Sequence, residues 1–152
     1  MSHKATTQVD LYDADALRAA LTEMDVAFVE NAQWIGYSTD QNTHADFLIE
    51  KQNPLLDGRY HYAGIGFREC DGKLELVMDS IDAASTTFRD LVTQFKRCYT
   101  ERAACNLLSK FGYRIVKQPD GTYRATATTK TVSALLRRAE AKNPQTIRVG
   151  RY

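Results

Sequence analysis

The spacing of apolar positions along the chain predicts two long helices set among strands. Residues 15–24 and 86–111 repeat apolar side chains every three or four positions, which is the spacing of one helical face. Elsewhere apolar and polar positions alternate, as in strands with one buried face. The expected strands cover residues 4–11, 26–29 (continued or paired by 34–37), 45–51, 60–70, 74–81, 113–118 and 122–128.

The turn residues indicate how these strands connect. Asp71-Gly72 joins two alternating segments and is the strongest hairpin signal in the chain, and residues 119–121 mark a second hairpin. Hairpins join antiparallel neighbours, so the fold class is predicted as α+β with a single, mainly antiparallel sheet. The order is β-α-β-β-β-β-α-β-β, with two helices on one face of the sheet and a basic C-terminal helix and tail.

The length of 152 residues and the apolar content of 43% predict one domain with a core of ordinary size. We expect this domain to cover residues 1–128, followed by a helix and tail extension over 129–152. No apolar run approaches the ~20 residues that span a bilayer, and no apolar signal segment follows the first residues. The expected location is therefore the cytoplasm, or the host cytoplasm if a phage encodes the chain, with no membrane partner.

Charge is distributed unevenly along the chain. Residues 1–88 contain six Lys and Arg against fifteen Asp and Glu, whereas residues 89–152 contain fourteen against four. Such asymmetry indicates an anionic partner or self-association, unless the two halves neutralise each other within one fold. The densest basic positions are Lys130, Arg137, Arg138, Lys142, Arg148 and Arg151. Three interpretations of these residues are open. They form a solvated helix face and tail, they contact nucleic-acid or nucleotide phosphates, or they dock on the acidic surface of the same or a neighbouring chain.

A second candidate site, for a small ligand, combines aromatic, histidine and arginine side chains at Arg59, Tyr60, His61, Tyr62 and Arg68. His44 and Asp46 are candidates for a general-base pair, although no motif supplies a nucleophile. The alternative is that the histidine is an ordinary solvent-exposed surface residue. Gly64-x-Gly66 lacks the third glycine of a dinucleotide loop and indicates a flat spot where a helix or ligand approaches closely. No catalytic residue, metal or cofactor is predicted.

Several segments together resemble a known family. They are Met1–His3, Asp15–Leu21, Glu30–Gln33, Gly36-Tyr37, His44–Ile49, Gly64–Arg68 and Leu74–Asp79. Over about residues 1–128 the chain resembles the hypothetical-protein family numbered thirty-five among the plastid reading frames, which also occurs in cyanobacteria, other bacteria and phages. The family's function is unknown. The resemblance implies a protein partner, an ATPase of the AAA class encoded beside some members.

The chain departs from that family's pattern in two places. Members usually carry a Gln-x-Tyr-Ala-Tyr-like stretch where this chain has Gln94–Tyr99, and the segment from Lys130 onward is an addition. The sequence favours a non-enzymatic binding or adaptor module that acts through protein partners and forms homo-oligomers. One alternative is binding of nucleic acid or a nucleotide anion through the basic C-terminal segment. Another is a phage-type counter-defence protein that sequesters a signalling nucleotide or blocks a host enzyme.

Overall fold

A computed structural model of the chain describes residues 3–37, 41–56, 63–129, 132–133 and 136–138. It divides into two compact units, residues 1–103 and 104–152, and the boundary falls within a long helix. The elements of the first unit are β1 (Lys4–Val9), α1 (Ala14–Glu23), β2 (Val29–Trp34), β3 (Thr43–Ile49), η2 (Pro54–Leu56), β4 (Ile65–Cys70), β5 (Lys73–Asp79), α2 (Ser80–Ala83) and most of α3 (Thr86–Lys110). The second unit contains the end of α3 with β6 (Tyr113–Lys117) and β7 (Tyr123–Ala127).

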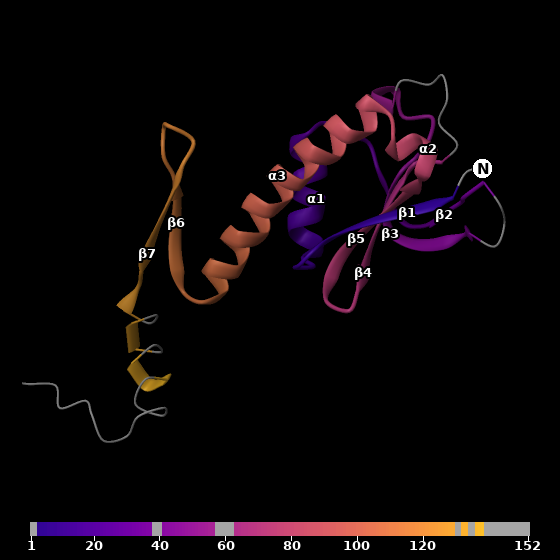
Figure 1. The fold of residues 1–152 in the computed structure, drawn as a ribbon. Helices are drawn as coiled ribbons and strands as arrows, with labels where there is room; N and C mark the ends of the chain where they lie inside the picture. Colours follow the sequence, from indigo (N-terminus) through magenta and orange to yellow (C-terminus); the bar gives the residue numbers. More distant parts are fainter. Residues whose placement is uncertain (1–2, 38–40, 57–62, 130–131, 134–135, 139–152) are drawn as a thin grey trace, which may run out of the picture. The chain divides into compact units, whose positions relative to one another are not determined.

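The predicted α+β class and the antiparallel pairing are confirmed, but the sheet is not single. Five strands form one antiparallel sheet in the order β1-β5-β4-β3-β2, and β6 and β7 form a separate two-stranded sheet (Figure 1). The β6–β7 hairpin was correctly predicted from the sequence. However, the local alternation of apolar and polar residues does not show which other strands a hairpin pairs with. The second strand also differs from the prediction, because it spans only Val29–Trp34.

The main core lies between the five-stranded sheet and the helices α1 and α3, which cover one face of it (Figure 1). Alternate residues of the central strands supply the sheet side, including Phe67 on β4 and Leu76 on β5. The helices contribute Leu17 and Leu21 from α1 and a stripe of α3 side chains that includes Phe95. The rings of Phe67 and Phe95 lie 4.7 Å apart between their centroids. The predicted two-helix layer is thus confirmed.

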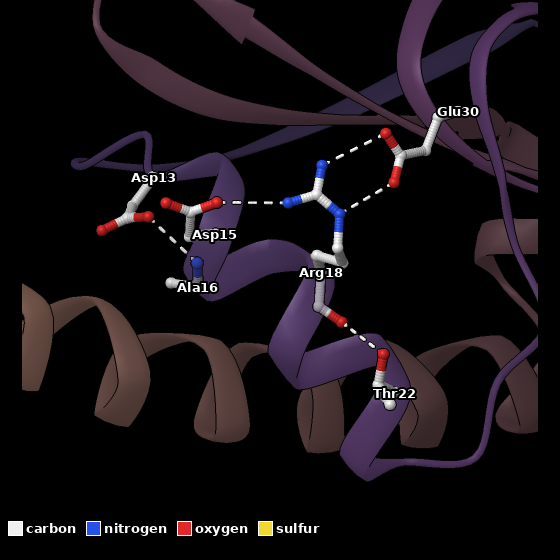
Figure 2. A network of polar contacts seen from close by, with 6 residues as sticks. All are labelled: Asp13, Asp15, Ala16, Arg18, Thr22 and Glu30. Atoms are coloured by element: carbon white, nitrogen blue, oxygen red, sulfur yellow. Dashed lines mark hydrogen bonds and ion pairs between the residues drawn. The ribbon is translucent and has the colours of Figure 1, made fainter.

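Helix α1 follows the capping residue Asp13, and its Arg18 forms an ion pair with Glu30 of the sheet (Figure 2). The Asp13 carboxylate accepts a hydrogen bond of 2.9 Å from the Ala16 N–H, as expected for an N-cap residue. Arg18 donates two hydrogen bonds to Glu30 on β2, at 2.8 and 3.1 Å, and one to Asp15. This pairing lowers the pKa of Glu30 and raises the pKa of Arg18. Both side chains are exposed, so the bridge orients α1 more than it stabilises the fold.

The turn between β4 and β5 has the geometry that its sequence predicts. Asp71 and Gly72 have φ values of 53° and 76°, and Cys70 pairs with Lys73. Two consecutive residues with positive φ define the type I′ turn that favours Asp-Gly, because its twist matches that of the flanking strands. The turn therefore sets the register of the two central strands.

A second, smaller cluster covers the opposite face of the sheet. It contains Trp34, Ala45, Ala63 and Val77, and Trp34 is completely buried. The Trp34 indole N–H donates a 2.9 Å hydrogen bond to the Gly64 carbonyl. Trp34 is therefore a packing residue of this cluster. Ala63 belongs to this cluster, whereas Ile65 and Phe67 belong to the main core.

The two glycines beside this cluster lie close to other parts of the chain. A side chain at Gly64 would place its Cβ 1.8 Å from the Ile49 carbonyl oxygen, and one at Gly66 would meet Trp34 and Ala45. The close neighbours are thus a backbone segment and an indole ring. The flat spot was predicted, and among the described residues the segments that approach it are the end of β3 and Trp34 of β2.

The Tyr99 hydroxyl joins α3 to the segment that precedes α1. It donates a hydrogen bond to the Leu11 carbonyl at 2.5 Å and accepts one from the Asp13 N–H at 2.9 Å. Tyr99 is completely buried, and burial raises the pKa of its hydroxyl. These bonds connect residues more than eighty positions apart in the chain.

Replacing Tyr99 by phenylalanine is expected to lower the free energy of unfolding by about 1–3 kcal/mol, because both partners lose their bonds. Since the folded pKa lies above the unfolded value of about 10, the hydroxyl's contribution is complete below that pH and is lost as the pH rises past it. Urea unfolding between pH 7 and 11 measures both effects. Tyr113→Phe, in the second unit, is the control. Equal stability of Tyr99→Phe and wild type at pH 7 would contradict the assignment.

The described residues also show the state of the three cysteines and the character of the helices. Cys70, Cys98 and Cys105 are free thiols, and each is partly exposed. Cys98 packs against the main core. Within the described part of the chain, none of the helices has both the length and the apolar character needed to cross a membrane.

Candidate functional site

The predicted small-ligand site can be followed at one residue, Arg68. The other four predicted residues, Arg59, Tyr60, His61 and Tyr62, lie outside the described residues. Arg68 on β4 stands directly opposite Glu75 on β5, and its Nε donates to the Glu75 carboxylate. Glu75 is buried, so Arg68 serves as the partner of a buried carboxylate. The ligand site remains a prediction.

The predicted basic segment is represented by Arg137 and Arg138. Both are exposed and both lie in helical backbone. Lys130, Lys142, Arg148 and Arg151 lie outside the described residues. The described part agrees with a solvated basic helix face, which leaves the anion-binding prediction open.

His44 and Asp46 are close, but Asp46 is engaged in holding the fold. One carboxylate oxygen accepts hydrogen bonds from the Tyr12 hydroxyl and from the Glu69 N–H, both at 2.9 Å. The other oxygen lies 3.5 Å from His44 Nε2, on an exposed imidazole. Burial and the Asp46 carboxylate raise the pKa of Tyr12. The cluster therefore links β3 and β4 to the segment before α1. Among the described residues, no group of three or more His, Cys, Asp or Glu side chains could hold a metal ion.

The second unit exposes a surface that the sequence did not predict. No described residue between 104 and 138 is buried. The predicted core stripe of α3 was extended too far, because Leu107 and Phe111 are 41% and 52% exposed. A helix of 25 residues is about 38 Å long, whereas strands of six or seven residues cover about 20–23 Å. The helical pattern continues past the length that the sheet can cover.

We call the exposed apolar and basic side chains of residues 104–138 the C-terminal surface. Its apolar members are Leu107, Phe111, Val116, Tyr123, Val132 and Leu136. Its basic members are Lys110, Arg114, Lys117, Arg124, Arg137 and Arg138. The β6–β7 register places Arg114 and Arg124 on one face of the hairpin. On the other face the Lys117 ammonium lies 5.5 Å from the centre of the Tyr123 ring.

A groove runs between the edge strand β1 and helix α3 in the first unit. Its volume is about 300 Å³. Five of its ten lining residues are apolar, and the others are two cations and three threonines: Ala5, Thr6, Thr7, Met78, Ala83, Phe88, Arg89, Val92, Thr93 and Lys96. The Lys96 ammonium donates a 2.8 Å hydrogen bond to the Thr7 hydroxyl. This groove was not predicted, because it depends on which strand lies at the edge of the sheet.

Together these features define an α+β protein with a helix-covered antiparallel sheet and two candidate binding surfaces. A family model described as a protein of unknown function (DUF1257) matches residues 20–126, and the chain belongs to this family. The match runs from within α1 to the end of β7 and stops before the basic extension. Comparisons with curated proteins and with solved structures find no match.

Proposed function

We propose that this protein is a non-enzymatic binding module that self-associates and acts through protein partners. The observation that carries the proposal is the C-terminal surface, with six large apolar side chains exposed and no described residue of 104–138 buried. A two-stranded hairpin is at best marginally stable in water without further packing. Extended exposed apolar surface on a folded protein marks an interaction site.

The occupant that we propose for this surface is a second copy of the chain. Residues 104–152 contain ten Lys and Arg against two Asp and Glu, whereas residues 1–103 contain ten against seventeen. A second copy therefore offers both apolar side chains and an excess of acidic charge to a basic, apolar surface. Complementary charge orients such an encounter, and apolar burial supplies most of its free energy.

The partners of the assembled module are a separate part of this proposal. We place the chain in the plastid and cyanobacterial group of reading frame thirty-five, on the segments that carry the resemblance. That group implies an ATPase of the AAA class as the first protein to test. Self-association would present several copies of the first unit to such a partner at once, which raises the effective affinity.

Replacing Val116 by asparagine tests the self-association. Val116 is 45% exposed, so the change is expected to alter the stability of a single chain by no more than about 0.5 kcal/mol. Loss of its apolar contact with a second copy should weaken association about tenfold. Sedimentation equilibrium of the full chain over micromolar concentrations measures this constant for wild type and variant.

Val116→Ile is the matched control, because it keeps a β-branched apolar side chain at the same exposed position of β6. It should associate as wild type does. A wild-type chain that stays monomeric over the whole concentration range would refute the proposal. So would an assembly that nuclease treatment dissolves, because the basic side chains would then be binding nucleic acid in place of a second copy.

A further inference from the structure

In the described strands, the edge of β1 away from β5 has no neighbouring strand, and it lies beside the groove formed with α3. We propose that this groove binds an extended, acidic segment of a partner protein, which adds to the sheet as a strand next to β1. The occupant is defined by its chemistry as a segment with one apolar side chain and acidic side chains on the same face. This interaction is separate from self-association through the C-terminal surface.

The hydrogen-bonding pattern of β1 leaves one set of backbone groups directed away from the sheet. In the described strands, β1 has a single neighbour, β5. The Ser80 N–H donates to the His3 carbonyl at 2.7 Å, one step beyond the pair Lys4 and Asp79. Antiparallel pairs alternate between bonded and non-bonded. The backbone groups of Lys4, Thr6 and Gln8 therefore point outward, where an added strand could bond to them.

The groove lies where alternate side chains of an added strand would point. Ala5 and Val9 of β1 pack toward the main core, and Ala5 also lines the groove. An added strand continues the pleat of β1, so every second side chain would face α3. The floor and wall there include Met78, Phe88 and Val92. A cavity of about 300 Å³ accommodates one large aliphatic side chain together with part of the backbone. Edge-strand addition with side-chain pockets is a recurring mode of peptide recognition.

The charges around the groove favour an acidic occupant. Arg89 and Lys96 both line it, and the lining contains no Asp or Glu. Across the described residues, neither cation has a carboxylate within ion-pair distance, although Arg97 and Arg102 on the same helix each have one. Seven helical residues separate Arg89 from Lys96, which is about 10 Å along the axis. In a bound segment, acidic residues two positions before and after the apolar residue would lie near Arg89 and Lys96.

Two other occupants match these charges less well. Edge-to-edge pairing of two β1 strands would bring together segments that contain Lys4 and no acidic residue. The chain's own C-terminal residues after 140 contain three Lys and Arg and no Asp or Glu. Both would place positive charge beside Arg89 and Lys96. An acidic segment from another protein is therefore the better complement.

Selection of a displayed random heptapeptide library on the full-length protein tests the inference. Enriched peptides should share an apolar residue flanked two positions away by Asp or Glu. Fluorescence anisotropy then measures the affinity of a labelled enriched peptide. Arg89→Glu and Lys96→Glu should each weaken binding about tenfold, whereas Arg97→Glu, on the same helix outside the groove lining, should leave it unchanged. Methylation of alternate backbone nitrogens on the bonding edge of the peptide should abolish binding.

Three results would overturn the proposal. They are the absence of any enriched peptide, equal binding to wild type and to both groove variants, and full binding by every N-methylated peptide. Circular dichroism of each variant confirms that it is folded. Val116→Asn should bind the peptide as wild type does, so failure of self-association and failure of this groove are distinguishable. Enrichment of basic peptides would also refute the charge argument.

Discussion

Replacing Gly64 by alanine is expected to lower the free energy of unfolding by about 3 kcal/mol or more. The added Cβ would lie 1.8 Å from the Ile49 carbonyl oxygen and 3.0 Å from the Lys51 backbone nitrogen. These are backbone atoms, so no side-chain rotation relieves the overlap. The end of β3 must move away from the chain that leads into β4, which disturbs the pairing of Ile49 with Ile65.

Urea unfolding followed by the fluorescence of Trp34, the single tryptophan, measures this loss. Gly66→Ala is the matched control, because its Cβ would lie 3.2–3.3 Å from side-chain atoms of Trp34 and Ala45. Those neighbours can shift by a few tenths of an ångström, so the cost should be clearly smaller. Equal stability of Gly64→Ala and wild type would show that the approach of Ile49 is not as close as described.

Replacing Trp34 by alanine is expected to cost about 3–5 kcal/mol, the range for deleting a buried aromatic side chain. The indole is completely buried, packs with Ala45, Ala63 and Val77, and bonds to the Gly64 carbonyl. Alanine would leave a cavity and an unpaired carbonyl oxygen on the face of the sheet opposite the main core. Circular dichroism during urea unfolding measures the change, because the variant contains no tryptophan.

Two variants separate the parts of this effect. Trp34→Phe keeps a ring but removes the N–H donor, so it should cost less than alanine and still leave the Gly64 carbonyl without its bond. Ile35→Ala changes the next residue, which is 62% exposed, and should alter stability by no more than about 0.5 kcal/mol. If Ile35→Ala and Trp34→Ala cost the same, the second cluster contributes no specific packing.

Much of the fold was predictable because its signals are local. The Asp13 cap, the α1 repeat and the Asp-Gly turn each act within a few residues, and the structure has all three. The strands that alternate most regularly, such as β3 and β5, were predicted within one or two residues of their bounds. Residues 26–37 alternate less regularly, and the strand predicted there was misplaced. Trp34 is buried by cross-strand packing that no nearby residue indicates.

The candidate binding surfaces were less predictable for a physical reason. The groove beside β1 exists because the N-terminal strand pairs with β5 and remains at the edge of the sheet. Strand order depends on contacts between distant residues, which a single sequence does not display. Thr7 and Lys96, 89 positions apart, illustrate this dependence. The C-terminal surface was missed because Leu107 and Phe111 repeat the helical spacing of the core residues before them.

The chain alone thus established the fold class, the order of its elements, the main helix face and the contrast between acidic and basic parts. Those properties follow from side-chain periodicity, turn chemistry and charge, all of which act over short distances. Tertiary structure separated β6 and β7 from the five-stranded sheet, buried Trp34 against Gly66, and left β1 at an edge beside Arg89 and Lys96. These outcomes depend on which distant segments meet, because hydrophobic burial is non-directional and the backbone selects its partner strands only as the whole sheet forms.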